Sequence, residues 1–150
     1  MFVYEKVMTC PPHWSYYYSL EDDLVEFSRY VEICEDNFLT YSTQLTRLLL
    51  AAASEADVVA KTLCTQLDPQ AKRKNIEDYR QVIAEKRPAV KTMRLGIEGS
   101  EIALTPWESW GADSPESPAW WRGYNSVKHD RHSNFREGNL QNALNAVAGL

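Results

Sequence analysis

One long amphipathic segment, from Leu45 to Leu67, constrains the fold more than any other feature of the sequence. Its apolar residues recur at the i, i+3, i+4, i+7 spacing of a helix for about six turns. They are Leu45, Leu48, Leu49, Ala52, Ala56, Val59, Ala60, Leu63 and Leu67. Asp68-Pro69 ends the segment, because proline cannot continue a helix. Such a stripe must be covered by other elements, so the segment predicts the central helix of a bundle.

Weaker helical patterns lie on both sides of this segment. Ser19 and Asp22 have the spacing of a capping box, and apolar residues then recur as far as Cys34. A third helix is predicted by Ile76, Tyr79, Val82 and Ile83, with Pro88 closing it. These patterns predict one helix before the long helix and one after it.

Two more helices are predicted near the C-terminus. Ser117-Pro118 has the form of an N-cap followed by proline at the first helical position, opening a helix that runs to about His129. Asn134 is the predicted cap of the last helix, whose apolar stripe is Leu140, Ala143, Leu144 and Val147. Between residues 90 and 104, short alternation around Glu98-Gly99-Ser100 indicates a small hairpin or an extended loop. We therefore predict a single domain over residues 1–150: mostly α, an antiparallel up-and-down helical bundle with a short hairpin or irregular insertion before the last two helices.

Composition limits the classes of function. The longest apolar run, Leu48–Ala53, is far shorter than the roughly 18 residues that span a bilayer, and no signal peptide is visible, so we expect a cytoplasmic protein without a membrane segment. The odd set of three cysteines, Cys10, Cys34 and Cys64, has no C-x-x-C pair. Cys10-Pro11-Pro12-His13 offers two potential ligands without a second pair. We therefore predict reduced, buried cysteines, no metal site and no cofactor.

Charge is distributed unevenly along the chain. The formal net charge is -5, yet residues 122–136 hold four Lys/Arg against a single acid, Asp130. This basic segment carries +3, which leaves -8 for the rest of the chain. Phosphate groups are contacted mainly by lysine and arginine, so any nucleic-acid site is expected in this segment.

The helix within this segment has two different faces. At about 100° per residue, Arg122, Asn125, His129 and possibly His132 fall on one side, opposite the core-forming Trp120, Tyr124 and Val127. Histidine exchanges protons near neutral pH and arginine matches a phosphate, so the polar side suits phosphodiester chemistry. A solvated or hydrogen-bonded surface pair is the commoner role of these residue types and stays open.

Two further groups have alternative interpretations. The tryptophans at positions 107, 110, 120 and 121 could stack on bases, but we count them as core packing. Glu55 and Asp57 lie at the margins of the apolar stripe of the long helix. They are either a solvated edge or acids that orient a basic group.

The run Trp120–Arg131, followed by Asn134-Phe135 and a last helix, resembles the C-terminal signature of HEPN-type domains, helical bundles of prokaryotic defence and toxin systems. Members often carry R-x4-6-H on a late helix, which Arg122-x6-His129 matches at the upper limit. Glu55 and Asp57 resemble the acidic position that accompanies this motif. The resemblance is specific over about the last 40 residues and architectural before them.

The resemblance implies a metal-independent ribonuclease. His129 would be the acid/base, Arg122 the phosphate clamp, and Asn125 would hold the imidazole or a phosphate oxygen. Lys128, Arg131 and His132 would add positive charge for RNA. Because helical side chains lean toward the N-terminus, Arg122 points away from His129, with Cα atoms about 10 Å apart. Family sites form where two copies of the motif meet, so we expect a homodimer through the Trp120–His132 helix.

Three functions remain open at this point. The first is an RNA-cleaving toxin or antiphage ribonuclease, with an antitoxin as a possible partner. The second is a non-catalytic HEPN-like module that binds a nucleotide or polyanion or mediates dimerisation. The third is a polar face buried against a partner protein, where the histidine only satisfies a hydrogen bond. Metal-independent cleavage that is lost in both His129→Ala and Arg122→Ala would separate the first function from the others.

Overall fold

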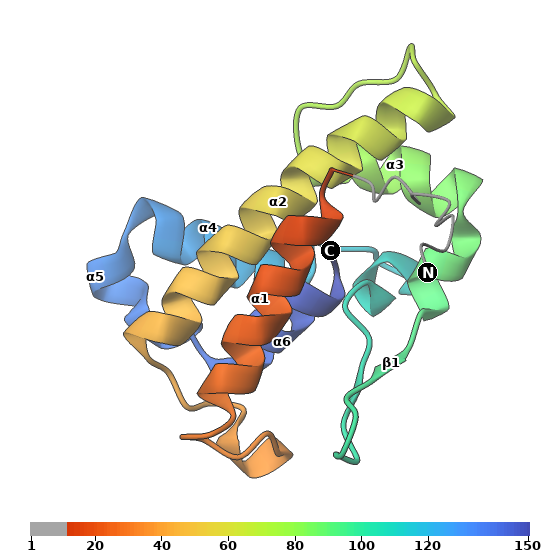
Figure 1. Cartoon of the computed structure of the whole chain (residues 1–150). Helices are drawn as coiled ribbons and strands as arrows, with labels where there is room; N and C mark the ends of the chain where they lie inside the picture. Colours follow the sequence, from red (N-terminus) through yellow and green to blue (C-terminus); the bar gives the residue numbers. More distant parts are fainter. Residues whose placement is uncertain (1–11) are drawn as a thin grey trace, which may run out of the picture.

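A computed structural model describes residues 12–150 of the chain as a helical bundle with one two-stranded hairpin (Figure 1). In chain order the elements are α1 (Trp14–Phe27), η1 (Glu35–Asn37), α2 (Thr43–Leu67), α3 (Ile76–Lys86), η2 (Pro88–Thr92), β1 (Leu95–Gly96), β2 (Ala103–Leu104), η3 (Glu108–Gly111), α4 (Ala119–His129), α5 (Arg131–Asn134), η4 (Phe135–Glu137) and α6 (Leu140–Ala148). The predicted fold class is confirmed.

Helix α2 is the central element of the bundle. It packs against α1, α3, α4 and α6, and it crosses the whole molecule in Figure 1. Its inner face is closed to solvent, with Leu45, Leu49, Ala52 and Cys64 fully buried. Ser42 caps its start by accepting a hydrogen bond from the Leu45 N–H at 3.1 Å. The long helix predicted from the apolar spacing is therefore confirmed together with its end at Asp68.

Helix α1 begins and ends earlier than predicted. The capping box at Ser19 and Asp22 was wrong, since Ser19 lies inside the helix and its hydroxyl donates to the Tyr16 carbonyl at 2.9 Å. The apolar spacing continues beyond Phe27 because residues of the following loop, Val31 and Phe38 among them, also pack against the core. Periodicity therefore extended the predicted helix into a loop that is buried for tertiary reasons.

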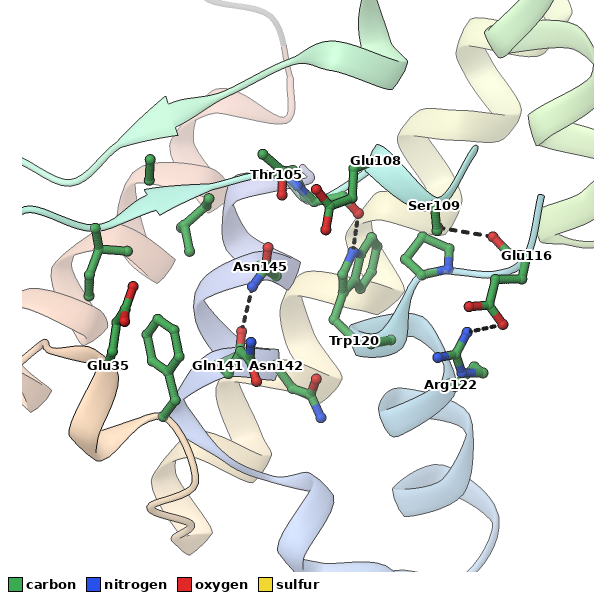
Figure 2. Close-up of a pocket in the computed structure, with 17 residues that line it drawn as sticks. Glu35, Thr105, Glu108, Ser109, Glu116, Trp120, Arg122, Gln141, Asn142 and Asn145 are labelled. Atoms are coloured by element: carbon green, nitrogen blue, oxygen red, sulfur yellow. Dashed lines mark hydrogen bonds and ion pairs between the residues drawn. The ribbon is translucent and has the colours of Figure 1, made fainter. Parts of the chain in front are cut away.

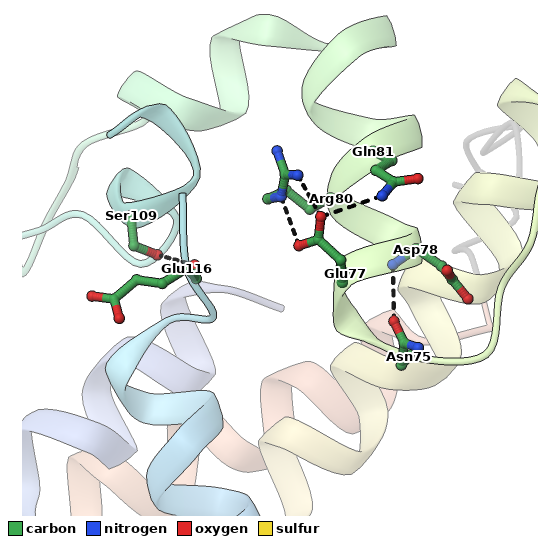
Figure 3. A network of polar contacts seen from close by, with 7 residues as sticks. All are labelled: Asn75, Glu77, Asp78, Arg80, Gln81, Ser109 and Glu116. Atoms are coloured by element: carbon green, nitrogen blue, oxygen red, sulfur yellow. Dashed lines mark hydrogen bonds and ion pairs between the residues drawn. The ribbon is translucent and has the colours of Figure 1, made fainter. Parts of the chain in front are cut away.

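Helix α3 lies where its apolar spacing predicted it. Asn75 caps it, with Oδ1 accepting from the Asp78 N–H at 3.0 Å, and Arg80 donates from Nε to Glu77 at 2.8 Å (Figure 3). The Arg80 guanidinium lowers the pKa of Glu77 by binding its carboxylate form. These polar contacts fix the first turn while Tyr79 and Ile83 face the core.

The predicted hairpin is also present. Strands β1 and β2 pair antiparallel with Leu95 opposite Leu104, and Gly99 at the turn has φ +78°, a conformation that favours glycine. The chain then enters a tryptophan cluster: Trp107 and Trp120 meet edge to face at 5.1 Å, and Trp120 Nε1 donates to the Pro106 carbonyl at 2.8 Å. The four tryptophans 107, 110, 120 and 121 are buried, so their assignment to packing is confirmed.

The last three helices depart from the prediction at their caps. Pro118, and not Ser117, is the N-cap of α4, so the helix begins one residue later than predicted, at Ala119. Helix α4 ends at His129, and Asp130 then caps the separate short helix α5. Asn139, not Asn134, caps α6 by accepting from the Asn142 N–H at 2.9 Å. Asn134 is not the cap because it is part of α5, where its Nδ2 donates to the Asp130 carbonyl at 2.8 Å.

Candidate functional site

Helix α4 has one buried and one polar face, as its sequence predicted. Trp120, Trp121, Tyr124 and Val127 are buried in the core. Arg122, Lys128 and His129 are exposed, and Asn125 is half-buried. Its large apolar side chains are thus all used within the chain, so a dimer through α4 would have a polar interface.

Arg122 and His129 lie at opposite ends of α4. The Arg122 guanidinium donates to the Ser117 carbonyl and pairs with Glu116 at 3.0 Å, both at the N-terminal end of the helix. His129 is the last residue of α4, about 10 Å further along the axis. A single chain therefore does not bring the predicted phosphate clamp and the predicted acid/base together.

A basic corner forms at the other end of α4. It consists of Lys128, His129, Arg131, His132 and Arg136, all exposed, on α4, α5 and η4. Asp130, the only acid between them, caps α5. The hydroxyl and then the backbone N–H of Ser133 lower the pKa of Asp130, because they stabilise its carboxylate. This corner collects the residues that were predicted to bind RNA.

The basic corner borders a pocket of about 320 Å³, which we call the corner pocket. Its walls are Arg131 and His132 on one side and the start of α2 on the other; the remaining lining residues are Tyr41, Ser42, Thr43, Thr46 and Phe135. The N-terminus of a helix carries free N–H groups and partial positive charge. The corner pocket therefore combines two basic side chains with the N-terminal turn of a long helix.

Two aromatic rings stand at the edge of the corner pocket. Tyr41 and Phe135 meet edge to face with centroids 5.3 Å apart, and each is more than 40% exposed. The Arg136 guanidinium lies 5.9 Å from the centre of the Tyr41 ring. Sequence reasoning missed both rings. Phe135 had a usable signal, since it lies within the basic segment, whereas nothing in the sequence places Tyr41 there.

The two predicted acids lie elsewhere. Glu55 accepts from His13 Nδ1 at 2.5 Å. Asp57 accepts from the Tyr79 hydroxyl at 2.7 Å and pairs with Lys61 at 2.5 Å. Glu55 does contact a histidine, but it is His13 of the chain before α1 and not His129. Neither acid joins the polar face of α4.

A second pocket, of about 300 Å³, lies at the N-terminal end of α4 and contains Arg122 (Figure 2). Its lining comes from η1, β2, η3, the start of α4, and α6, together with residues of the adjoining loops. The predicted site residues are thus divided between two cavities. Arg122 belongs to the second pocket, and Arg131 and His132 belong to the corner pocket.

Other elements of the described chain add no metal centre. Within residues 12–150, no group of three or more His, Cys, Asp or Glu side chains is arranged to hold a metal ion. Cys64 is a buried free thiol and Cys34 a half-buried one, so the prediction of burial holds fully only for Cys64. Cys10 of the Cys10-Pro11-Pro12-His13 segment lies outside the described residues.

Comparison with known protein families, with curated proteins and with solved structures gives no match to this chain. In the part of the chain that the structure describes, no helix has both the length and the apolar character of a bilayer-spanning segment.

Proposed function

We propose that this chain is a HEPN-like protein that binds single-stranded RNA at the basic corner. The observation that carries the proposal is the corner pocket, where Arg131 and His132 face the start of α2. A phosphate group at this position would meet a guanidinium, an imidazole and the positive end of a 25-residue helix. The resemblance of the Trp120–Arg131 run to HEPN domains supports RNA as the ligand class.

The exposed rings favour a single strand over a duplex. Single-stranded nucleic acids bind where a positive surface follows the backbone and aromatic side chains stack on the bases. Tyr41 and Phe135 are exposed rings beside the basic corner, and Arg136 lies near one of them. A duplex keeps its bases stacked on one another and would leave these rings unused.

Binding is tested by fluorescence anisotropy with a labelled single-stranded RNA in EDTA. We expect Arg131→Ala to weaken binding about tenfold, a loss of about 1.4 kcal/mol, and to reduce the slope of log K against log salt by about 0.7. Arg94→Ala removes an exposed arginine outside the corner and is the matched control. Equal effects of the two substitutions would mean that only overall charge matters and would refute a site at the corner.

RNA cleavage is the second candidate function. It is favoured by two exposed imidazoles, His129 and His132, three residues apart at the basic corner, because acid/base catalysis of phosphodiester cleavage needs groups that give and take protons. Arg122 would then have to come from a second copy of the chain, as in the homodimer that the resemblance implies. Gel analysis of the same EDTA samples tests this, with cleavage expected from the parent and not from His129→Ala.

A further inference from the structure

Helix α1 has a second apolar stripe on its outer side. Trp14, Tyr18 and Val25 lie within about 40° of one another around the helix, and we call them the outer stripe. Each is more than 40% exposed, whereas Leu20 and Phe27 of the same helix are buried. Figure 1 shows α1 at the surface of the bundle, in front of α2 and α6, the helices that it packs against. The outer stripe is therefore left uncovered by the other elements of the described chain.

The aromatic part of the outer stripe is an ordered cluster of rings. The centroids of Trp14 and Tyr18 are 5.6 Å apart, and Tyr17 meets Trp14 edge to face at 5.5 Å. The Tyr17 hydroxyl donates to the Glu21 carboxylate at 2.8 Å, which fixes the Tyr17 ring. Aromatic side chains are enriched in protein–protein interfaces, because they give a large contact area at a low cost in conformational entropy. The outer stripe is thus suited to contact with another protein.

The charge of α1 decides which kind of protein surface fits. The helix contains four acids and no lysine or arginine; the acids are Glu21, Asp22, Asp23 and Glu26. Glu21 lies three residues after Tyr18 and four before Val25, so it shares the outer face, where it is half-buried. A partner that covered the outer stripe with apolar side chains alone would bury this carboxylate without a cation, which costs free energy. The partner must therefore bring lysine or arginine.

The spacing along the outer face favours a helix as the partner. Trp14, Tyr18, Glu21 and Val25 are separated by four, three and four residues, the spacing of the seam between two packed helices. Basic side chains beside such a seam reach acids on the facing helix. Their methylene stems also pack on aromatic rings, and their cations are attracted to the ring faces.

We propose that the outer stripe docks a basic amphipathic helix of another protein. Its apolar side chains would cover Trp14, Tyr18 and Val25, and its lysines or arginines would pair with Glu21 and Asp22. A second copy of this chain does not supply such a helix through its basic segment, because the large apolar side chains of α4 are buried in the core. The outer stripe lies on α1, apart from the basic corner, so this contact does not depend on RNA binding.

The test is fluorescence anisotropy of the RNA-free protein with a labelled synthetic helix of about three heptads, with leucine in the seam and lysine beside it. We expect one-to-one binding that weakens as the salt concentration rises. The same peptide with glutamate in place of lysine should not bind. Failure of the lysine peptide to bind, or equal binding of the two peptides, would overturn the proposal whether or not the protein binds RNA.

Substitutions locate the contact on α1. Val25→Arg replaces an exposed apolar side chain of the outer stripe by a charge that repels the peptide, and we expect it to weaken binding at least tenfold. Met93→Arg makes the same change of charge at an exposed apolar residue before β1 and should leave the affinity within about twofold of the parent. Equal effects of the two substitutions would refute docking at the outer stripe.

Two further measurements test the acid and the identity of the partner. Glu21→Gln keeps an acceptor for the Tyr17 hydroxyl but removes the charge, so it should weaken peptide binding and reduce its dependence on salt. An unchanged salt dependence would contradict the pairing with Glu21. Sedimentation equilibrium of the parent without peptide should show no self-association that Val25→Arg abolishes. Such self-association would identify a second copy as the occupant of the outer stripe and would overturn the proposal.

Discussion

Asn142 of α6 packs directly against the backbone of α4 at Gly123, where an added Cβ atom would lie 2.6 Å from Asn142 Nδ2. The same Cβ would lie 3.2 Å from Oε2 of Glu137, the acceptor of the Asn142 amide. A Cβ at this position would therefore force the Asn142 side chain to shift away from its hydrogen bonds to Glu137. The place of glycine next to Arg122 has a packing cause and needs no explanation from RNA chemistry.

We expect Gly123→Ala to lower the free energy of unfolding by about 1–3 kcal/mol, the usual cost of overpacking. A loss of stability would be informative, because replacing glycine by alanine in an ordinary helix interior raises the stability of the helix by about 1 kcal/mol. Urea unfolding followed by circular dichroism measures the change.

Gly96→Ala is the control for this prediction, because no atom lies within 4 Å of the Cβ that it would add. It should change the free energy of unfolding far less. A Gly123→Ala protein as stable as the parent would show that the two helices separate easily, contrary to the close packing at Asn142.

The separation of Arg122 from the basic corner predicts different effects of two arginine substitutions. Arg122→Ala should leave the affinity for single-stranded RNA within about twofold of the parent, because its guanidinium is held by Glu116 at 3.0 Å and lies outside the corner pocket. Arg131→Ala should weaken it about tenfold. Anisotropy titrations at one fixed salt concentration compare the two.

A marked loss of RNA binding in Arg122→Ala alone would contradict this division into two sites. It would indicate that RNA follows the whole length of α4, from the pocket that contains Arg122 to the basic corner. Glu116→Gln then serves as a check, because freeing Arg122 from its partner should in that case strengthen RNA binding.

If Tyr41 and Phe135 stack on bases, removing one of these rings should lower the affinity for single-stranded RNA by the same factor at every salt concentration. Phe135→Ala should weaken binding of single-stranded RNA about tenfold, since stacking of one base on a ring is worth about 1–3 kcal/mol. The slope of log K against log salt should stay the same, because no phosphate contact is removed. Anisotropy titrations at several salt concentrations give both quantities.

Tyr30→Ala is the matched control for stacking. Tyr30 is 79% exposed and does not line the corner pocket. If it reduces affinity as much as Phe135→Ala does, exposed aromatics bind RNA without regard to position, and the corner pocket has no special role.

The sequence was sufficient for elements with regular spacing and strong terminators. The apolar stripe of α2 predicted its start to within two residues, the proline after it predicted its end, and Glu98-Gly99-Ser100 predicted the turn of the hairpin. The N-cap residues were harder to predict, because several asparagines near the C-terminus could each cap a helix equally well. Only the folded chain shows that Asn139 caps α6 while Asn134 is used by α5.

The site was predictable only where it is local in the sequence. The basic segment identified Lys128, Arg131 and His132, and the structure places them at one corner. Tyr41 reaches this corner through tertiary contacts: the Ser42 N–H donates to the Gly138 carbonyl at 3.2 Å, and residues 41 and 139 form a bridge. Spacing along one helix likewise could not show that Arg122 is held by a residue that precedes the helix.

Tyr79 gives a prediction about alkaline stability. It is fully buried, and its hydroxyl donates to Asp57 at 2.7 Å. Burial, and then the hydrogen bond to Asp57, raise the pKa of Tyr79 above the value of about 10 in an unfolded chain. The folded state therefore holds the phenolic proton more tightly. The resulting stabilisation is complete below about pH 10 and is lost as the pH rises from there through the folded pKa.

Replacing Tyr79 by phenylalanine should therefore cost about 1 kcal/mol at neutral pH, the net value of one hydrogen bond, and should flatten the alkaline loss of stability. Urea unfolding of the parent and of Tyr79→Phe at about pH 8 and about pH 11 measures both effects, and Tyr30→Phe, at an exposed position, is the control. The parent should lose more stability between the two pH values than Tyr79→Phe. Equal losses would mean that the Tyr79 proton is not held by the fold, and that the contact with Asp57 does not join α3 to α2.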